Sequence, residues 1–289
     1  MKLFPLRQPS SAPRGFTIIE IALCLGIIGF ALVAILAALP SGLNVQKRNR
    51  EETIIGEDAG VWMSALRTGA RGYDDLTNNV LCITNFWTRY NADFSTGPSG
   101  FDYYTPTNSL ITSTNVPSFL LTNGARIIGL LSTPKRIPDV IDPPYQSNYV
   151  VAYVRAFSGA AVDKAPQNNA TILADAFIYR MIVENFPYTP VDTNAYCLDC
   201  PATNNATPAQ MTDRTNLMKT VALLQANAHD FRLLFRWPVL PSGQIPNVGF
   251  ATFRSMADGQ LVQTNDSDPT LVNQSLYFVQ PSTFTTNAP

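Results

Sequence analysis

The sequence is poor in the residues that carry most enzyme chemistry. Among its 289 residues there is one histidine, His229, and only 14% of the residues are charged. No nucleophile, pair of acids or glycine-rich phosphate loop stands out beside that histidine, so we expect neither catalysis nor a cofactor. We expect His229 to be a partly exposed residue next to a strand. The formal net charge of −1 leaves no basic field, so we expect no nucleic-acid partner.

Lysine is scarce in the larger, C-terminal part of the chain. After residue 75 the lysines are Lys135, Lys164 and Lys219 only, while asparagine, threonine, serine and proline dominate. This polar but weakly charged composition is typical of an exported domain. The length allows one membrane helix together with one or two compact domains.

One stretch near the N-terminus is strongly apolar. From Phe16 to Leu39 the apolar run is interrupted only by Thr17 and Glu20. At about 1.5 Å per residue, a helix over this stretch is about 36 Å long and can cross a hydrocarbon core of about 30 Å. The sequence therefore predicts a membrane-spanning helix. An ordinary secretory signal would have a shorter apolar core and no carboxylate.

Glu20 is the unusual residue of this helix, because a carboxylate within a membrane span is costly and usually has a partner. One interpretation is that Glu20 reaches the headgroup layer from its place near the helix start. The other is that it meets a positive charge lying in the same layer, where two desolvated charges can neutralise each other. The residues alone leave both open.

The residues around Glu20 form a known pattern. Gly15, Phe16, Thr17, Ile18, Ile19 and Glu20 follow a short basic leader, and this G-F-T-I-I-E resembles the class III signal peptide of type IV pilins and type II secretion pseudopilins. The resemblance implies cleavage by prepilin peptidase between Gly15 and Phe16 and N-methylation of Phe16. It also implies that Glu20 pairs with the terminal amine of a neighbouring subunit, and that the chain sits in a bacterial inner membrane with its C-terminal domain exported.

Small residues and a proline interrupt the apolar helix at Gly26, Gly29 and Pro40. Glycine and proline weaken a helix interior, but neighbouring helices can supply the lost contacts in a membrane. By the resemblance, this part of the helix unwinds or kinks in an assembled filament. Close helix packing at small residues explains the same pattern equally well.

A second amphipathic stretch follows the proline. Ile55, Ala59, Trp62, Leu66 and Ala70 recur at helical spacing, which predicts that the helix continues outside the membrane to about Gly72 and lays an apolar stripe on a globular domain. The expected organisation is a leader over 1–15, a membrane and assembly helix over 16–40, its exported continuation over 41–72, and a β-rich domain over 73–289.

The C-terminal domain has strand-like and loop-like segments. Residues 73–148 are rich in turn residues and predict mostly irregular surface, with brief strands or helix turns at 119–121 and 126–131, and residues 188–214 predict a second long loop. Strands are expected at 149–157 and 174–184, as a hairpin at 230–237 and 248–256, and at an edge over 276–279, whereas 217–226 could be helix or strand. The sum is an α+β, pilin-like fold: a long bent N-terminal helix, transmembrane in its first half, packed on an antiparallel sheet with long loops. The segments 231–238 and 251–256 loosely resemble the pilin-like group called Verru_Chthon cassette protein B.

Two loops carry candidate ligands or cross-links. Cys197 and Cys200 form a C-x-x-C, for which a structural disulfide is favoured over a zinc site or a redox motif, with Cys82 either unpaired or bonded to one of them. Asp266 and Asp268 place oxygen ligands close together, as calcium prefers, but a solvated turn is favoured because their spacing fits no recognised calcium loop.

These patterns favour a subunit of a type IV pilus-like or type II secretion pseudopilus filament. The size of the chain favours a minor subunit. Its expected partners are other pilin or pseudopilin subunits, prepilin peptidase and the inner-membrane assembly platform. The alternative is a membrane-anchored, exported binding domain that uses a pilin-type signal without polymerising. A metal-dependent exported enzyme is a third hypothesis, which bound zinc or calcium would support.

Overall fold

The computed structural model describes most of the chain beyond the leader. The described residues are 15–69, 73–91, 93, 95–106, 118–138, 145–158, 177–188, 207–240, 242–246, 249–265 and 275–286. They fall into two compact units that divide between Glu51 and Glu52. The fold class is α+β, as the sequence predicts, with a long N-terminal helix followed by a sheet of eight strands.

Helix α1 (Ile18–Thr68) contains 51 residues and belongs to both units. It runs unbroken through Gly26, Gly29 and Pro40 in the isolated chain. It ends four residues before the predicted end at Gly72, because Gly69 follows with φ 63°, the left-handed conformation in which glycine commonly stops a helix. A side chain at this position would also meet the Val279 carbonyl oxygen, since a Cβ there would lie 2.2 Å from it.

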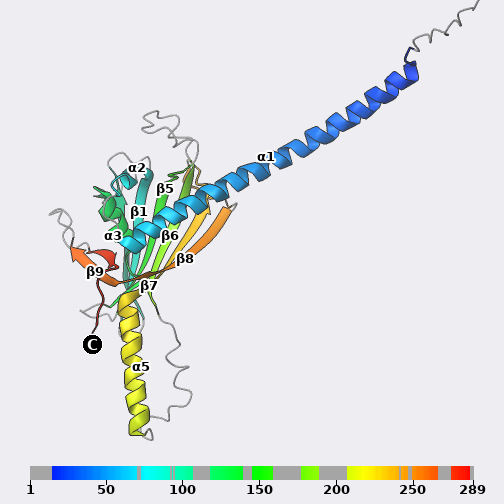
Figure 1. Cartoon of the computed structure of the whole chain (residues 1–289). Coiled ribbons are helices and arrows are strands. Elements are labelled where there is room, and N and C mark those ends of the chain that lie inside the picture. The colour runs from blue at the N-terminus through cyan, green and yellow to red at the C-terminus, as the bar shows by residue number, and fades with distance from the viewer. Residues whose placement is uncertain are drawn as a thin grey trace, which may run out of the picture. The chain divides into compact units, whose positions relative to one another are not determined.

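The main sheet follows the order β3-β2-β1-β5-β6-β7-β8, with β4 paired to β5 (Figure 1). All neighbouring pairs are antiparallel except β2 and β3, which are parallel. The strands are β1 (Val80–Tyr90), β2 (Thr96–Thr105), β3 (Ser118–Leu120), β4 (Arg136–Pro138), β5 (Tyr145–Arg155), β6 (Ile178–Pro187), β7 (Ala228–Trp237) and β8 (Gly249–Asp258).

The predicted strands of the second half are confirmed, with shifted ends, as β5, β6, β7 and β8, and β7 pairs with β8 as the predicted hairpin. The strand expected at 276–279 exists as β10 (Ser275–Gln280). It pairs with β9 (Gln260–Asn265) in a separate two-stranded sheet, so it is not an edge of the main sheet.

Two predictions about irregular structure are wrong. Residues 73–148 hold β1 to β4, the start of β5 and two short helices, α2 (Leu76–Asn79) and α3 (Gly124–Leu131), and β1 lies inside the sheet between β2 and β5. The undecided segment 217–226 is helical, but its helix, α5 (Pro208–Asn227), begins inside the predicted loop. Proline is favoured in the first turn of a helix, where its missing N–H has no partner to lose.

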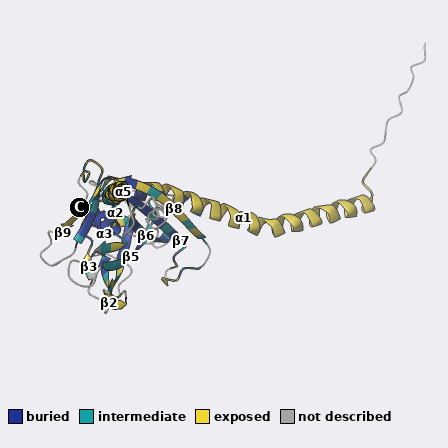
Figure 2. Ribbon diagram, turned by 90° about the horizontal axis from the view of Figure 1, so that it is seen from below, coloured by how far each residue is buried: buried dark blue, intermediate teal, exposed yellow. Residues whose placement is uncertain are grey.

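The core lies between one face of the main sheet and the second half of α1. The buried residues of α1 all lie between Ile54 and Leu66, while the helix before them is exposed (Figure 2). Trp62 and Leu66 are fully buried and belong to one apolar cluster with alternate residues of the strands, such as Phe231, Leu233 and Phe235 of β7. Four residues of the periodic stripe, Ile55, Ala59, Trp62 and Leu66, are therefore buried as predicted, and Ala70 lies outside the described residues.

Candidate assembly site

The residues of the predicted cleavage and assembly motif span the start of α1. Gly15 and Phe16 precede the helix and are exposed. The Thr17 hydroxyl oxygen accepts a hydrogen bond from the backbone N–H of Glu20 at 3.3 Å, so Thr17 caps the helix. Glu20 lies in the first turn, where a negative charge is favourable beside the unpaired N–H groups of the helix start. The motif thus fixes where α1 begins.

The helix beyond Glu20 presents apolar side chains on every side. From Phe16 to Val45 each described large apolar side chain is exposed, and Phe16, Ile18 and Ile19 are 80%, 87% and 78% exposed. A helix that is apolar all round is suited to burial in a membrane or among other helices. Among the described residues, α1 is the one helix long and apolar enough to cross a membrane. This helix could therefore anchor the chain in a bilayer.

A polar segment follows the apolar half of α1. Lys47 and Glu51 approach to 3.9 Å one helical turn apart, and Arg48 and Arg50 are exposed beside them. Charged residues at this position mark the end of the apolar stretch.

A buried carboxylate fixes the second half of α1 on the sheet. Asp58 is 1% exposed. Its Oδ2 atom accepts hydrogen bonds from the Phe157 N–H and the Tyr179 hydroxyl, both at 3.0 Å. Its Oδ1 atom accepts from the Ser158 N–H at 3.3 Å and from the Ser158 hydroxyl at 2.8 Å. Trp62, one turn along the helix, donates its indole N–H to the Tyr179 oxygen at 3.0 Å.

The Asp58 network ties α1 to residues about a hundred positions away, just after β5 and within β6. Burial raises the pKa of Asp58 above its usual value, although the hydrogen bonds from Ser158, Phe157 and Tyr179 oppose that shift. The carboxylate therefore sets the position of α1 along the sheet through four directional contacts.

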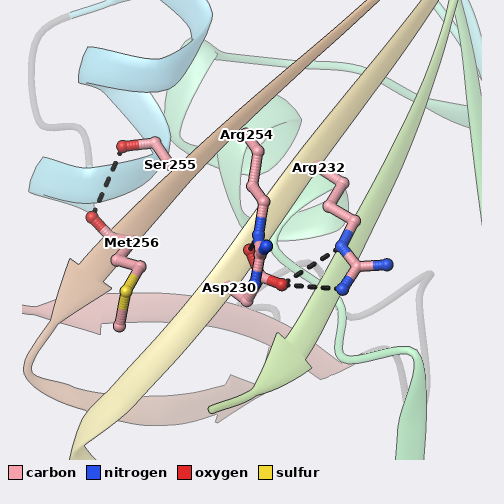
Figure 3. Close-up of polar contacts among 5 residues, drawn as sticks. All are labelled: Asp230, Arg232, Arg254, Ser255 and Met256. Atoms are coloured by element: carbon pink, nitrogen blue, oxygen red, sulfur yellow. Dashed lines mark hydrogen bonds and ion pairs between the residues drawn. The ribbon is translucent and has the colours of Figure 1, made fainter. Parts of the chain in front are cut away.

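A second charged cluster joins β7 to β8 on the opposite side of the sheet. Arg232 donates from Nε and Nη2 to Oδ2 of Asp230 at 3.1 and 2.9 Å, and Arg254 donates from Nε to Oδ1 at 2.7 Å (Figure 3). Burial alone would raise the pKa of Asp230, but the hydrogen bonds and charges of Arg254 and Arg232 outweigh it and lower the pKa. One carboxylate thus holds two arginines that face each other across the strand pair.

The expectation that His229 is partly exposed is wrong, since the residue is 5% exposed. Burial lowers its pKa to about 4, so the ring is neutral near pH 7. Neither ring nitrogen has a hydrogen-bond partner within the described structure. Cys82 is a free, buried thiol whose burial raises its pKa to about 11, and Cys24 is free and exposed.

The other candidate ligands lie outside the described residues. These are Cys197, Cys200, Asp266 and Asp268, so the disulfide and the calcium site stay predictions. In the part of the chain that the structure describes, no three histidine, cysteine or acidic side chains gather as metal ligands would.

The sequence reasoning missed Asp58 and the Asp230 cluster. Asp58 could have been found, because it lies three residues after Ile55 and four before Trp62, on the same helical stripe as the apolar residues that pack on the sheet. An acid on such a stripe must find donors in the core. The Asp230 cluster depends on the β7–β8 register, which the sequence did not fix.

Comparisons of the chain with protein-family models, curated proteins and solved structures found no match. The architecture itself is pilin-like, because a long apolar N-terminal helix is followed by a β-sheet domain.

Proposed function

We propose that the protein is a pilin-like subunit of a type IV pilus-like or type II secretion pseudopilus filament. In this proposal, prepilin peptidase removes residues 1–15 at the cytoplasmic face of a bacterial inner membrane, and the new amine of Phe16 is methylated. The C-terminal domain is exported, and subunits are drawn from the membrane by the assembly platform. The role is structural rather than enzymatic, and the size of the domain favours a minor subunit.

The observation that carries this proposal is the division of α1 into two parts with different surroundings. Residues 54–66 are packed on the sheet, whereas the apolar side chains from Phe16 to Val45 are exposed in the single chain. So much exposed apolar surface needs either lipid or the helices of other subunits around it. A filament subunit uses both in turn, first in the membrane and then in the filament core.

Glu20 supplies the register of the assembly in this proposal. It is the one acid between Phe16 and Gln46, and it lies one turn from the amine that cleavage would create. If neighbouring helices are shifted axially by about one turn, the amine of one comes level with the carboxylate of the other. Bringing both charges into an apolar filament core is favourable only when they pair.

The experiment compares Glu20→Gln with Glu57→Gln in cells that express the full chain. Glu57 is an exposed acid on the same helix, outside the apolar half and next to Asp58. Processing, membrane content and sheared filament content of the protein are measured together. We expect Glu20→Gln to be cleaved and to stay in the membrane while its filament content falls, and we expect Glu57→Gln to behave as the unsubstituted chain.

Equal filament content of both variants would contradict the role of Glu20. Absence of the processed chain from any filament fraction would instead favour a membrane-anchored binding domain that does not polymerise.

A further inference from the structure

Three aromatic side chains form a row on the face of the sheet that α1 does not cover. Side chains alternate along a strand, so Ile83, which points into the core, places Phe86 on the opposite face. Phe86 lies directly across from Phe101 of β2 and from Tyr149 of β5. We call Phe101, Phe86 and Tyr149 the aromatic row, which crosses three adjacent strands at right angles to them.

The rings of the aromatic row are in contact with each other and remain open to solvent. The ring centres of Phe86 and Phe101 are 5.9 Å apart, and those of Phe86 and Tyr149 are 6.4 Å apart. Phe86, Phe101 and Tyr149 are 46%, 47% and 38% exposed. Neighbouring rings are tilted by 41° and 47°, so the three rings do not share one plane.

Polar groups border the row at Tyr149. The Lys135 ammonium lies 4.9 Å from the centre of the Tyr149 ring and 2.9 Å from Oε1 of Glu184. Glu184 offsets the charge of the cation that touches the row, so the border of the row at Tyr149 carries no net charge. Both groups can still exchange hydrogen bonds with hydroxyl groups of a ligand.

The area of the row suits a thin ligand better than a folded protein. A buried aromatic side chain covers about 150–250 Å², so three rings exposed by about two-fifths to one-half offer about 250 Å². A standard protein interface needs about 800 Å² on each partner. A straight row of rings matches an extended chain whose flat units each lie against one ring.

We propose that the aromatic row binds a neutral polysaccharide chain. The C–H faces of sugar rings are apolar and stack on aromatic rings, while their hydroxyl groups at the edges hydrogen-bond to groups such as Lys135 and Glu184. A single-stranded nucleic acid would also stack, but it requires a cationic groove along its phosphates. This inference does not depend on assembly into a filament.

The test measures the fraction of full chain, solubilised in a detergent without a sugar headgroup, that binds to insoluble cellulose, chitin, mannan and starch. We expect binding to at least one of these. The double substitution of Phe86→Ala and Phe101→Ala should weaken it by about 5-fold to 150-fold, since each stacked ring contributes about 0.5–1.5 kcal/mol. Tyr149→Phe, which keeps the ring, should bind as the unsubstituted chain does.

Phe250→Ala is the matched control, because Phe250 is a 72% exposed aromatic residue of β8 outside the row. Circular dichroism and thermal unfolding show whether each variant is folded. If loss of Phe86 and Phe101 reduces binding by no more than loss of Phe250, the row is not the site. Failure to bind all four polysaccharides, or displacement by single-stranded DNA of equal mass, would overturn the proposal.

Discussion

Replacing Asp58 by alanine should weaken the attachment of α1 to the sheet. The substitution leaves the N–H groups of Phe157 and Ser158 and the hydroxyls of Ser158 and Tyr179 without their acceptor. The Tyr179 oxygen keeps its contact with the indole of Trp62, and the Ser158 hydroxyl keeps a 3.5 Å contact with the Ile54 carbonyl oxygen. The perturbation therefore removes one carboxylate and leaves several donors unpaired.

The expected loss of unfolding free energy depends on the hydrogen-bonding groups that the substitution leaves unpaired. A buried polar group left without a partner costs about 1–3 kcal/mol, so the donors that Asp58→Ala leaves unpaired should together cost about 3–5 kcal/mol of unfolding free energy. Ser158→Ala removes the 2.8 Å hydroxyl contact with Asp58 and a longer, 3.5 Å contact with the Ile54 carbonyl oxygen, and should cost about 1.5–3 kcal/mol, chiefly as one hydrogen bond to a charged group. Glu57→Ala, at the neighbouring exposed position, should change the unfolding free energy by less than about 0.5 kcal/mol.

Urea unfolding of the full chain in detergent micelles, followed by near-ultraviolet circular dichroism, measures these differences. The raised pKa of Asp58 adds a pH signature, since burial favours its protonated form. The part of its contribution that depends on protonation is full below the unfolded pKa of 3.8 and is lost as the pH rises through the raised value. Asp58→Asn should abolish that dependence. If Asp58→Ala costs no more than Glu57→Ala, the carboxylate does not hold α1 on the sheet.

Two further predictions concern the globular unit. Because the pKa of His229 falls from 6.5 to about 4 on folding, the free energy of unfolding should drop by about 3 kcal/mol as the pH falls through that window. His229→Phe should flatten this pH dependence of stability, and an unchanged dependence would show that another group titrates. Gly69→Ala should destabilise the protein by at least about 1–2 kcal/mol, because it puts alanine in a left-handed conformation and in contact with Val279. Gly56 lies in open space on the same helix, so Gly56→Ala should stabilise the protein by about 0.5–1 kcal/mol. Thermal unfolding compares the two glycine variants, and equal shifts would refute this account of Gly69.

The strands that the sequence predicts are those with dense β-branched and aromatic residues, and β5 and β7 are examples. The missed strand β2 begins with Thr-Gly-Pro-Ser-Gly, which is typical of a turn. It becomes a strand because β1 pairs along it and because the Trp87 ring lies over Gly100, where a Cβ would come within 2.6 Å of that ring. Such cross-strand packing is tertiary and cannot be found in a local window.

The residues of the candidate site also differ in how far the sequence alone predicts them. The apolar helix and Glu20 are local features, so the sequence alone predicts them. Asp58 has a local signal in its place on the buried stripe, but its partners Ser158 and Tyr179 are known only once β5 and β6 are placed. The aromatic row depends wholly on register, because Phe86, Phe101 and Tyr149 come together through strand pairing.

The mass of the intact chain extracted from membranes tests the central claim most directly. The account predicts a protein that begins at Phe16 and carries one methyl group on its terminal amine. A chain that still contains residues 1–15, or one that begins beyond Pro40, would contradict it.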